Sequence, residues 1–230
     1  MEYKNIHRGI FKSRPNRFIA YVEIYGQEEV CHVKNTGRCR ELLIPGSIVY
    51  LEESDNPNRK TRYDLVAVEK NGKMFNIDSQ APNKVAQEWL ESQDCDILFN
   101  AEEVQIKPEC KYKNSRFDFF IETEDRKIFM EVKGVTLEEE GRVRFPDAPS
   151  ERAVKHLEEL MEAKSEGYEA YVLFVIQMEG PSYFTPNEDT HPKFCEILRT
   201  AEEMGVKVLA YDCLVTESSM TLKTQTEVRL

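Results

Sequence analysis

Two carboxylates and one amine stand at a spacing that could support cleavage of a phosphodiester. Asp118 lies inside one apolar run of residues, and Glu131 and Lys133 lie at the end of a second. If the polar stretch between the runs turns midway, between Glu124 and Asp125, the two runs form a hairpin. That register places Asp118 directly opposite Glu131.

Opposed residues of an antiparallel pair have Cβ atoms about 5 Å apart, and like charges there repel. On apolar strands, two such carboxylates need a cation between them or a raised pKa. Lys133 falls on the same face as Glu131, because side chains alternate along a strand. Hard oxygens from Asp118, Glu131 and the Val132 carbonyl suit Mg²⁺ or Mn²⁺. The competing interpretation is a surface hairpin with a cross-strand Glu–Lys pair.

The segments that follow the hairpin alternate between helix and strand. Ser150 is a suitable N-cap for a helix over 151–166, and Gly167 suits its C-terminal end. A second helix is expected over 193–204. The runs 171–176 and 206–211 are apolar, as expected of covered strands. The order predicts an α/β domain with a mixed sheet.

The front of the chain reads as short strands separated by turn residues. Asn71-Gly72 between two such runs is a strong hairpin signal. Five strands within 85 residues predict a small all-β, OB-like barrel. A single helical turn is expected over 38–43. The expected strands are Phe18–Tyr25, Glu29–Val33, Ile48–Leu51, Tyr63–Glu69 and Lys73–Ile77.

The sequence pattern changes from strand-like to helix-like near Pro82, because proline has no N–H to donate within a sheet. Asn83 is suited to cap a helix over 84–91. We therefore place a domain boundary here, with an OB-like domain over 1–82 and an α/β domain over 83–230.

Charge and composition restrict the function classes. The net charge is −11, with +2 over residues 1–82 and −13 over residues 83–230. An acidic protein repels polyanions, so broad binding of nucleic acid is not expected. The front half could still offer a local cationic face, whereas the back half would need a metal to approach a phosphate. The six cysteines form no Cys-x-x-Cys pair, and Cys31, His32 and Cys39 lack a fourth zinc ligand. Without a signal sequence or a 20-residue apolar run, we expect a cytoplasmic protein with no membrane contact.

Several short motifs occur in one order across nearly the whole chain, and together they resemble the sugar fermentation stimulation protein A family. The hairpin and the helix after it also resemble the core of PD-(D/E)xK nucleases. The motifs are Asn35-Thr36-Gly37-Arg38, Ser54-Asp55-Asn56-Pro57, Pro82-Asn83, Ser115-Arg116-Phe117-Asp118-Phe119, Glu131-Val132-Lys133-Gly134-Val135-Thr136-Leu137, Phe145-Pro146-Asp147-Ala148, Glu151-Arg152 and Lys155-His156-Leu157.

The resemblance implies an OB-like N-terminal domain, a restriction-endonuclease-like C-terminal domain and DNA as partner. It implies that Asp118 and Glu131 bind Mg²⁺ or Mn²⁺ and that Lys133 orients or activates the attacking water. A further metal carboxylate is expected from the preceding helix, with Glu88 as candidate and Glu102 or Glu103 as rivals.

Basic residues supply the expected DNA contacts. The N-terminal ones form a strip beside aromatic residues, as on nucleic-acid-binding OB surfaces, although the aromatics themselves are expected in the core. Arg40, Arg59, Lys60 and Arg62 could extend this face. The candidate DNA-binding residues are Lys12, Arg14, Arg17, Arg38, Arg116, Arg152, Lys155 and His156.

The sequence leaves two main functions open. The first is a Mg²⁺-dependent nuclease, and the second is a non-catalytic DNA-binding regulator of sugar (maltose) metabolism. A sugar-metabolism enzyme is a third alternative, but no motif resembles a sugar site. The oligomeric state is open, with a homo-oligomer among the alternatives.

Overall fold

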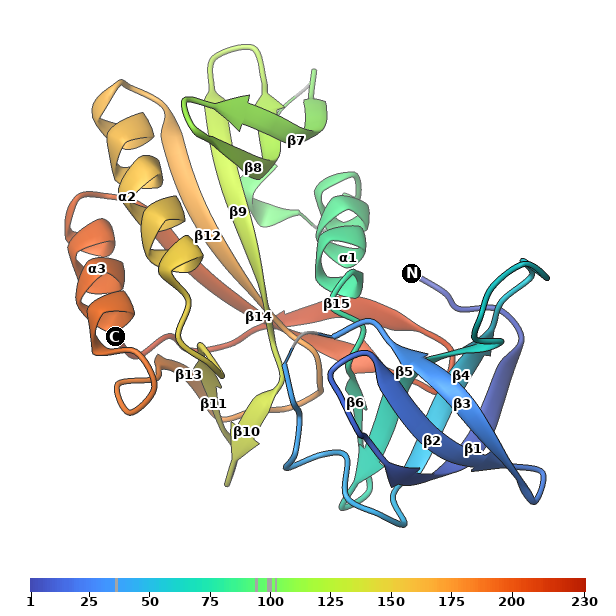
Figure 1. The fold of residues 1–230 in the computed structure, drawn as a ribbon. Coiled ribbons are helices and arrows are strands. Elements are labelled where there is room, and N and C mark those ends of the chain that lie inside the picture. The colour runs from blue at the N-terminus through green and yellow to red at the C-terminus, as the bar shows by residue number, and fades with distance from the viewer. Residues whose placement is uncertain (36, 94, 99–100, 102) are drawn as a thin grey trace.

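The computed structural model describes residues 1–35, 37–93, 95–98, 101 and 103–230. Its front half is a closed five-stranded barrel, seen in blue to cyan in Figure 1. The parallel pairing of β3 with β5 closes the barrel, and a sixth strand, β6, extends it beyond β5. The strands are β1 (Ile6–Ser13), β2 (Ile19–Ile24), β3 (Gln27–Val33), β4 (Ile48–Glu53), β5 (Tyr63–Lys70) and β6 (Lys73–Asn76).

All five strands expected from the sequence are present, but the first barrel strand, β1, was not expected. Its sequence mixes polar and apolar residues around Gly9. A Cβ at Gly9 would lie 2.5 Å from Val22 Cγ1, so glycine is needed for β1 to pack closely on β2. The Asn71-Gly72 hairpin is confirmed, with positive φ at both residues. The expected turn near Leu43 is closed by its backbone N–H donating to Cys39 O.

The back half is a six-stranded mixed sheet in the order β15-β14-β12-β9-β8-β7. β9, β12 and β14 run parallel, and β7, β8 and β15 add antiparallel pairs. This confirms the expected α/β fold with a mixed sheet. The strands are β7 (Gln105–Tyr112), β8 (Ser115–Glu122), β9 (Lys127–Val135), β12 (Glu169–Ile176), β14 (Lys207–Val215) and β15 (Met220–Gln225).

A small three-stranded sheet lies beside the main one and was not expected. It consists of β10 (Leu137–Glu139), β11 (Arg142–Phe145) and β13 (Tyr183–Pro186). A short 3₁₀ turn occupies Asp96–Leu98. No helix in the described part of the chain is long and apolar enough to cross a membrane.

Three helices cover the two faces of the main sheet. α2 (Glu151–Ser165) and α3 (Pro192–Glu203) lie on one side, and α1 (Ala81–Leu90) lies on the other (Figure 1). α2 begins as expected, since Ser150 Oγ accepts a hydrogen bond from the Ala153 N–H. The expected cap of α1 is wrong: the helix begins earlier, at Ala81, so Asn83 lies within its first turn.

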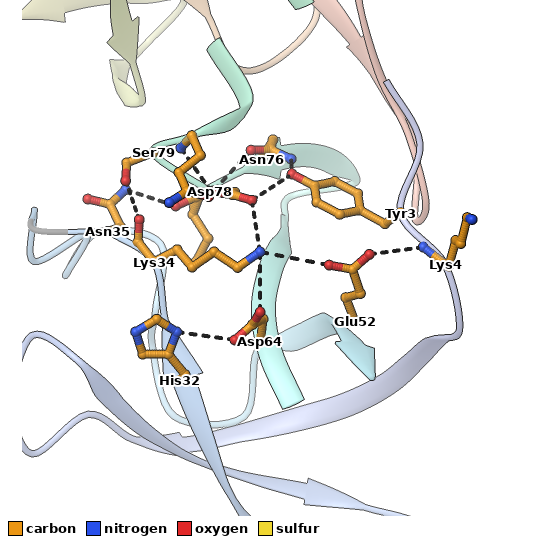
Figure 2. A network of polar contacts seen from close by, with 12 residues as sticks. Tyr3, Lys4, His32, Lys34, Asn35, Glu52, Asp64, Asn76, Asp78 and Ser79 are labelled. Carbon is orange, nitrogen blue, oxygen red and sulfur yellow. Dashed lines mark hydrogen bonds and ion pairs between the residues drawn. The ribbon is translucent and has the colours of Figure 1, made fainter. Parts of the chain in front are cut away.

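A polar network surrounds Lys34, Asp64 and Asp78 (Figure 2), and Gln177 joins it to the back half of the chain. Gln177 Nε2 donates to Asn76 Oδ1 and to the backbone oxygens of Asn76 and Asp78, at 3.0–3.2 Å. Lys34, from the segment after β3, lies between Asp64 and Asp78. Because these groups are buried and mutually bonded, the network fixes how the barrel sits against the sheet.

Candidate active site

The hairpin of β8 and β9 has the register that the sequence predicted. Glu122 pairs with Lys127, and the ladder continues to Phe119 opposite Met130. The turn is therefore centred between Glu124 and Asp125. Continuing this register by one residue sets Asp118 opposite Glu131, where the two strands begin to separate.

Asp118 is held by two donors. Its Oδ1 accepts from Asn83 Nδ2 and its Oδ2 from the Val132 N–H, each at 2.7 Å. In the bond to Val132, the Asp118 carboxylate takes the place of the backbone carbonyl that would accept this N–H in a regular sheet. Burial, reinforced by the charge of Glu131, raises the pKa of Asp118 above its ordinary value, despite both donors and Lys133.

Glu131 lies on the α2 side of β9 and is only 3% exposed. Its Oε1 accepts from Lys133 Nζ and from His156 Nδ1 of α2. Burial favours the neutral acid, but the His156 hydrogen bond and the Lys133 charge outweigh it, so the pKa of Glu131 is lowered. This burial excludes the alternative of a surface hairpin with an exposed Glu–Lys pair.

Glu131 Oε2 is buried and has no hydrogen-bond partner among the described residues. A buried carboxylate oxygen without a partner is costly. The charge of Glu131 helps to raise the pKa of Asp118, so the two carboxylates are neighbours. The pair therefore offers a free oxygen ligand in a place where a cation would be favoured.

His156 connects this carboxylate to the surface. Arg152 Nε, which can only donate, lies 3.4 Å from His156 Nε2. Nε2 is then the acceptor, and Nδ1 carries the proton that faces Glu131. His156 is 4% exposed and bonds to Glu131, so its side chain positions this carboxylate. Contact between His156 and DNA stays a prediction.

Three of the expected DNA-binding residues line one depression next to His156. Arg116, Arg152 and Lys155 are exposed and, with His156 and Glu151, line a pocket of about 570 Å³. Arg116 also pairs with Glu109 at 2.8 Å, and Lys155 donates to Asn114 O at 3.2 Å. The carboxylate partner of Arg116 is thus Glu109, and not Asp118 or Glu131.

The expected DNA-binding residues of the barrel behave differently from one another. Lys12 pairs with Glu23 at 2.6 Å. Arg14 donates to three backbone carbonyls and has a structural task. Arg17 and Arg38 are exposed and line a separate pocket.

Comparison with known proteins identifies the family. Residues 13–77 match the family model described as the SfsA N-terminal OB domain, and residues 80–219 match the one described as the sugar fermentation stimulation protein RE domain. The chain belongs to the SfsA family. This confirms the resemblance drawn from the sequence motifs.

Relatives within the SfsA family cover nearly the whole chain. The sugar fermentation stimulation protein homolog of Ruminiclostridium cellulolyticum is 56% identical over 100% of both chains. That of Desulfitobacterium hafniense strain DCB-2 is 60% identical over 96% of this chain and 94% of its own. The solved structure of Pyrococcus furiosus SfsA in complex with Ca²⁺ is 31% identical, covers 100% of this chain and 98% of that one, and has a TM-score of 0.90.

The third carboxylate expected at the SfsA site is not where the sequence analysis put it. Glu88 accepts from the N-terminal ammonium of Met1. It lies five positions beyond Asn83, on a different side of α1. Glu102 lies outside the described residues, and the side chain of Glu103 is exposed. In the described ranges, no cluster of three or more His, Cys, Asp or Glu side chains could hold a metal ion.

Asn83 and His156 are the site residues that sequence reasoning assigned to other tasks. Both lie within motifs that carry the family resemblance. Their pairing with Asp118 and Glu131 spans 35 and 25 residues, respectively. A helix period alone does not tell which strand residue a helix residue will meet.

Proposed function

We propose that this chain is a DNA-binding phosphodiesterase with a divalent cation at Asp118 and Glu131. The observation that carries the proposal is the buried, unpartnered Oε2 of Glu131, on a carboxylate next to the half-buried carboxylate of Asp118. The related Pyrococcus protein was solved in complex with Ca²⁺, which is consistent with a site for hard cations in this family.

The donor set fits such a cation. Carboxylate and carbonyl oxygens are the ligands of Mg²⁺ and Mn²⁺, and Asp118, Glu131 and the Val132 carbonyl would supply them. When bound, the cation would neutralise charge on a phosphate and acidify water. A third carboxylate is not required, because Mg²⁺ commonly keeps several waters in its coordination shell.

Lys133 and His156 have separate tasks in this proposal. Lys133 Nζ donates to Glu131 Oε1, the same oxygen that is bonded to His156. The ammonium group has three hydrogens, so it can also donate to a water or to a phosphate oxygen. His156 fixes the orientation of Glu131 through Nδ1. A fixed carboxylate favours cleavage because positioning lowers the barrier.

The DNA would approach through the basic depression. Arg116, Arg152 and Lys155 line it together with His156, which bonds to Glu131, in a half of the chain that carries −13 overall. Long-range repulsion therefore opposes the phosphate backbone, and these local cations would have to outweigh it. Each such phosphate contact adds about −0.9 to the slope of log affinity against log salt for duplex DNA.

The test compares cleavage of labelled single- and double-stranded DNA with Mg²⁺ or Mn²⁺ across variants. Lys133→Ala should lose activity by roughly 10²–10⁴-fold, as for a group that acts on the reacting proton. Asp118→Asn should lose activity because it removes a charged oxygen ligand of the cation. Lys127→Ala is the matched control: it removes a lysine of the same strand that pairs with Glu122 at 3.3 Å. Cleavage that survives both site substitutions as well as it survives Lys127→Ala would overturn the proposal.

A second function, a non-catalytic DNA-binding regulator of sugar metabolism, is favoured by one observation. Both oxygens of Asp118 are already taken by protein donors, and no third acidic side chain joins the pair in the part of the chain that the structure describes. DNA binding that persists in Lys133→Ala, with no cleavage by the wild-type protein, would favour this function.

A further inference from the structure

A second basic pocket lies on the barrel, apart from the carboxylates. It has a volume of about 750 Å³, within the range of small-ligand sites. Its lining residues come from the end of β1, the β1–β2 connection and the segment that follows β3. The pocket is lined by Phe11, Ser13, Arg14, Pro15, Asn16, Arg17, Arg38, Arg40, Leu43 and Pro45.

Three of the lining arginines have no carboxylate partner. Arg17, Arg38 and Arg40 are exposed, and none makes an ion pair with any described residue. Elsewhere on the barrel, Arg59 pairs with Asp64, and Arg62 pairs with Glu53 at 2.7 Å. In a chain of net charge −11, leaving three guanidinium groups unpaired around one hollow creates a local positive potential.

The fourth arginine holds the pocket in shape. Arg14 donates to the carbonyls of Arg17 and Arg38 at 2.7 Å and to that of Asn35 at 2.8 Å. It thereby ties together the two segments that carry the unpaired arginines. Asn16 Oδ1 accepts from the Phe18 N–H at 2.9 Å and fixes the same connection. The guanidinium groups of Arg17 and Arg38 are thus presented from an ordered backbone.

Cys39 stands between Arg38 and Arg40 in the sequence. It is 4% exposed and has φ of +46°, a conformation that non-glycine residues adopt infrequently. With its side chain in the core, its neighbours Arg38 and Arg40 are both left at the pocket. Such backbone conformations persist where the surroundings enforce them and are enriched at ligand sites.

We propose that this pocket binds a phosphate monoester, supplied by the end of a nucleic-acid strand or by a free phosphorylated small molecule. A terminal phosphate carries nearly two negative charges and three acceptor oxygens. Guanidinium groups match those oxygens in pairs. A phosphodiester inside a strand has one charge and two free oxygens, so it satisfies three arginines less well. The pocket does not depend on the carboxylate site or on cleavage.

The experiment measures binding of 12-nucleotide single strands in EDTA, which keeps any metal-dependent cleavage silent. One strand carries a terminal phosphate at the 5′ end, one at the 3′ end, and one has hydroxyl groups at both ends. A hydroxyl-ended strand two nucleotides longer controls for the added charge. The phosphate-ended strand that fits should bind roughly ten-fold tighter than both hydroxyl-ended strands, as expected of charge-assisted hydrogen bonds.

Arg38→Ala and Arg40→Ala should each abolish this preference, while Arg62→Ala should retain it. Arg62 is the matched control because it removes an exposed arginine of the same barrel that has its own carboxylate partner. Asp118→Asn should also retain the preference, which separates this pocket from the proposed cleavage site. Equal binding of all strands, or a preference that survives both pocket substitutions, would overturn the proposal.

Adenosine 5′-monophosphate as competitor distinguishes the two sources of the phosphate. If it displaces the phosphate-ended strand at a concentration similar to that strand's own dissociation constant, the ligand is a free phosphorylated small molecule. If it fails while the phosphate-ended strand keeps its preference, the ligand is a strand end. Either result supports the pocket, provided Arg38→Ala removes it.

Discussion

Replacing Lys34 by methionine should lower the urea concentration at which the protein unfolds. Lys34 Nζ lies 3.2 Å from Asp64, 3.4 Å from Asp78 and 3.8 Å from Glu52 (Figure 2). The Asp78 side chain is fully buried, and Lys34 itself is 16% exposed. The methionine side chain keeps most of the apolar stem and removes the charge.

The magnitude follows from what is left behind. Removing one partner of a buried ion pair costs about 3–5 kcal/mol, because the remaining charge has no compensation. Asp64 keeps Arg59, and Asp78 keeps the Tyr3 hydroxyl at 3.3 Å. We therefore expect the lower end, about 3 kcal/mol.

Urea unfolding followed by fluorescence of Trp89 measures the difference. Lys12→Met is the matched control, since its pair with Glu23 has both side chains about two-fifths exposed. Exposed pairs contribute less than about 1 kcal/mol. The reasoning is refuted if Lys34→Met costs no more than Lys12→Met. Adding Asp78→Asn to Lys34→Met should restore part of the lost stability.

The loss should also depend on pH. Burial raises the pKa of Asp64, but the hydrogen bond from Arg59 and the charge of Lys34 lower it further, so the net shift is downward. The stability from Asp64 is therefore present above the ordinary carboxyl pKa of about 3.9 and is lost as pH falls through the lowered folded value. The gap between wild type and Lys34→Met should narrow on acidification below that range.

Four further substitutions test other parts of the fold by the same unfolding assay. Ser150→Ala should cost about 1 kcal/mol, because it removes the Oγ that accepts from the Ala153 N–H. Phe174→Ala should cost about 3–5 kcal/mol, because Phe174 is fully buried and stacks on Phe184 at 4.2 Å between ring centroids. Gly134→Ala should cost about 1–3 kcal/mol, because the added Cβ would lie 2.5 Å from Gln177 Oε1 and 2.8 Å from Pro82 Cγ. Gly72→Ala should cost about 1 kcal/mol, because Gly72 has φ of +75° in the β5–β6 turn. A substitution among these four that causes no loss of stability would contradict the structural reason given for it.

The hairpin at the site could be predicted from sequence because its pattern allows one register. Two apolar runs flank a short polar stretch, and a shift of one residue would turn every side chain to the other face. β8 and β9 accordingly pair about a turn between Glu124 and Asp125. α2 was equally well specified, with Ser150 at its start and Gly167, at φ of +96°, just after its end.

Other elements are decided by packing that the local pattern does not show. β1 has a glycine in its centre, and it is a strand because the barrel needs it to close between β2 and β4. β10, β11 and β13 form their sheet from distant segments, since the paired Arg142 of β11 and Tyr183 of β13 are 41 positions apart. Such short strands have too few residues to display a period of two.

The site residues divide in the same way. Asp118, Glu131 and Lys133 follow from the hairpin register, which is a local property. His156 reaches Glu131 only because α2 packs against β9, and Asn83 reaches Asp118 only because the first turn of α1 lies beside β8. The residues that tune the carboxylates therefore depend on topology, and topology is specified by the whole chain.

The arginines of the barrel show that the sequence also does not reveal which charged side chains are paired. Arg38 and Arg40 on one side, and Arg59 and Arg62 on the other, look alike as basic residues in turn-rich segments. The structure separates them: Arg59 and Arg62 reach carboxylates on β5 and β4, whereas Arg38 and Arg40 meet none among the described residues. A cation already neutralised by its own protein attracts an anionic ligand weakly. Pairing across strands, rather than the number of basic residues, therefore decides where on this barrel a phosphate would be held.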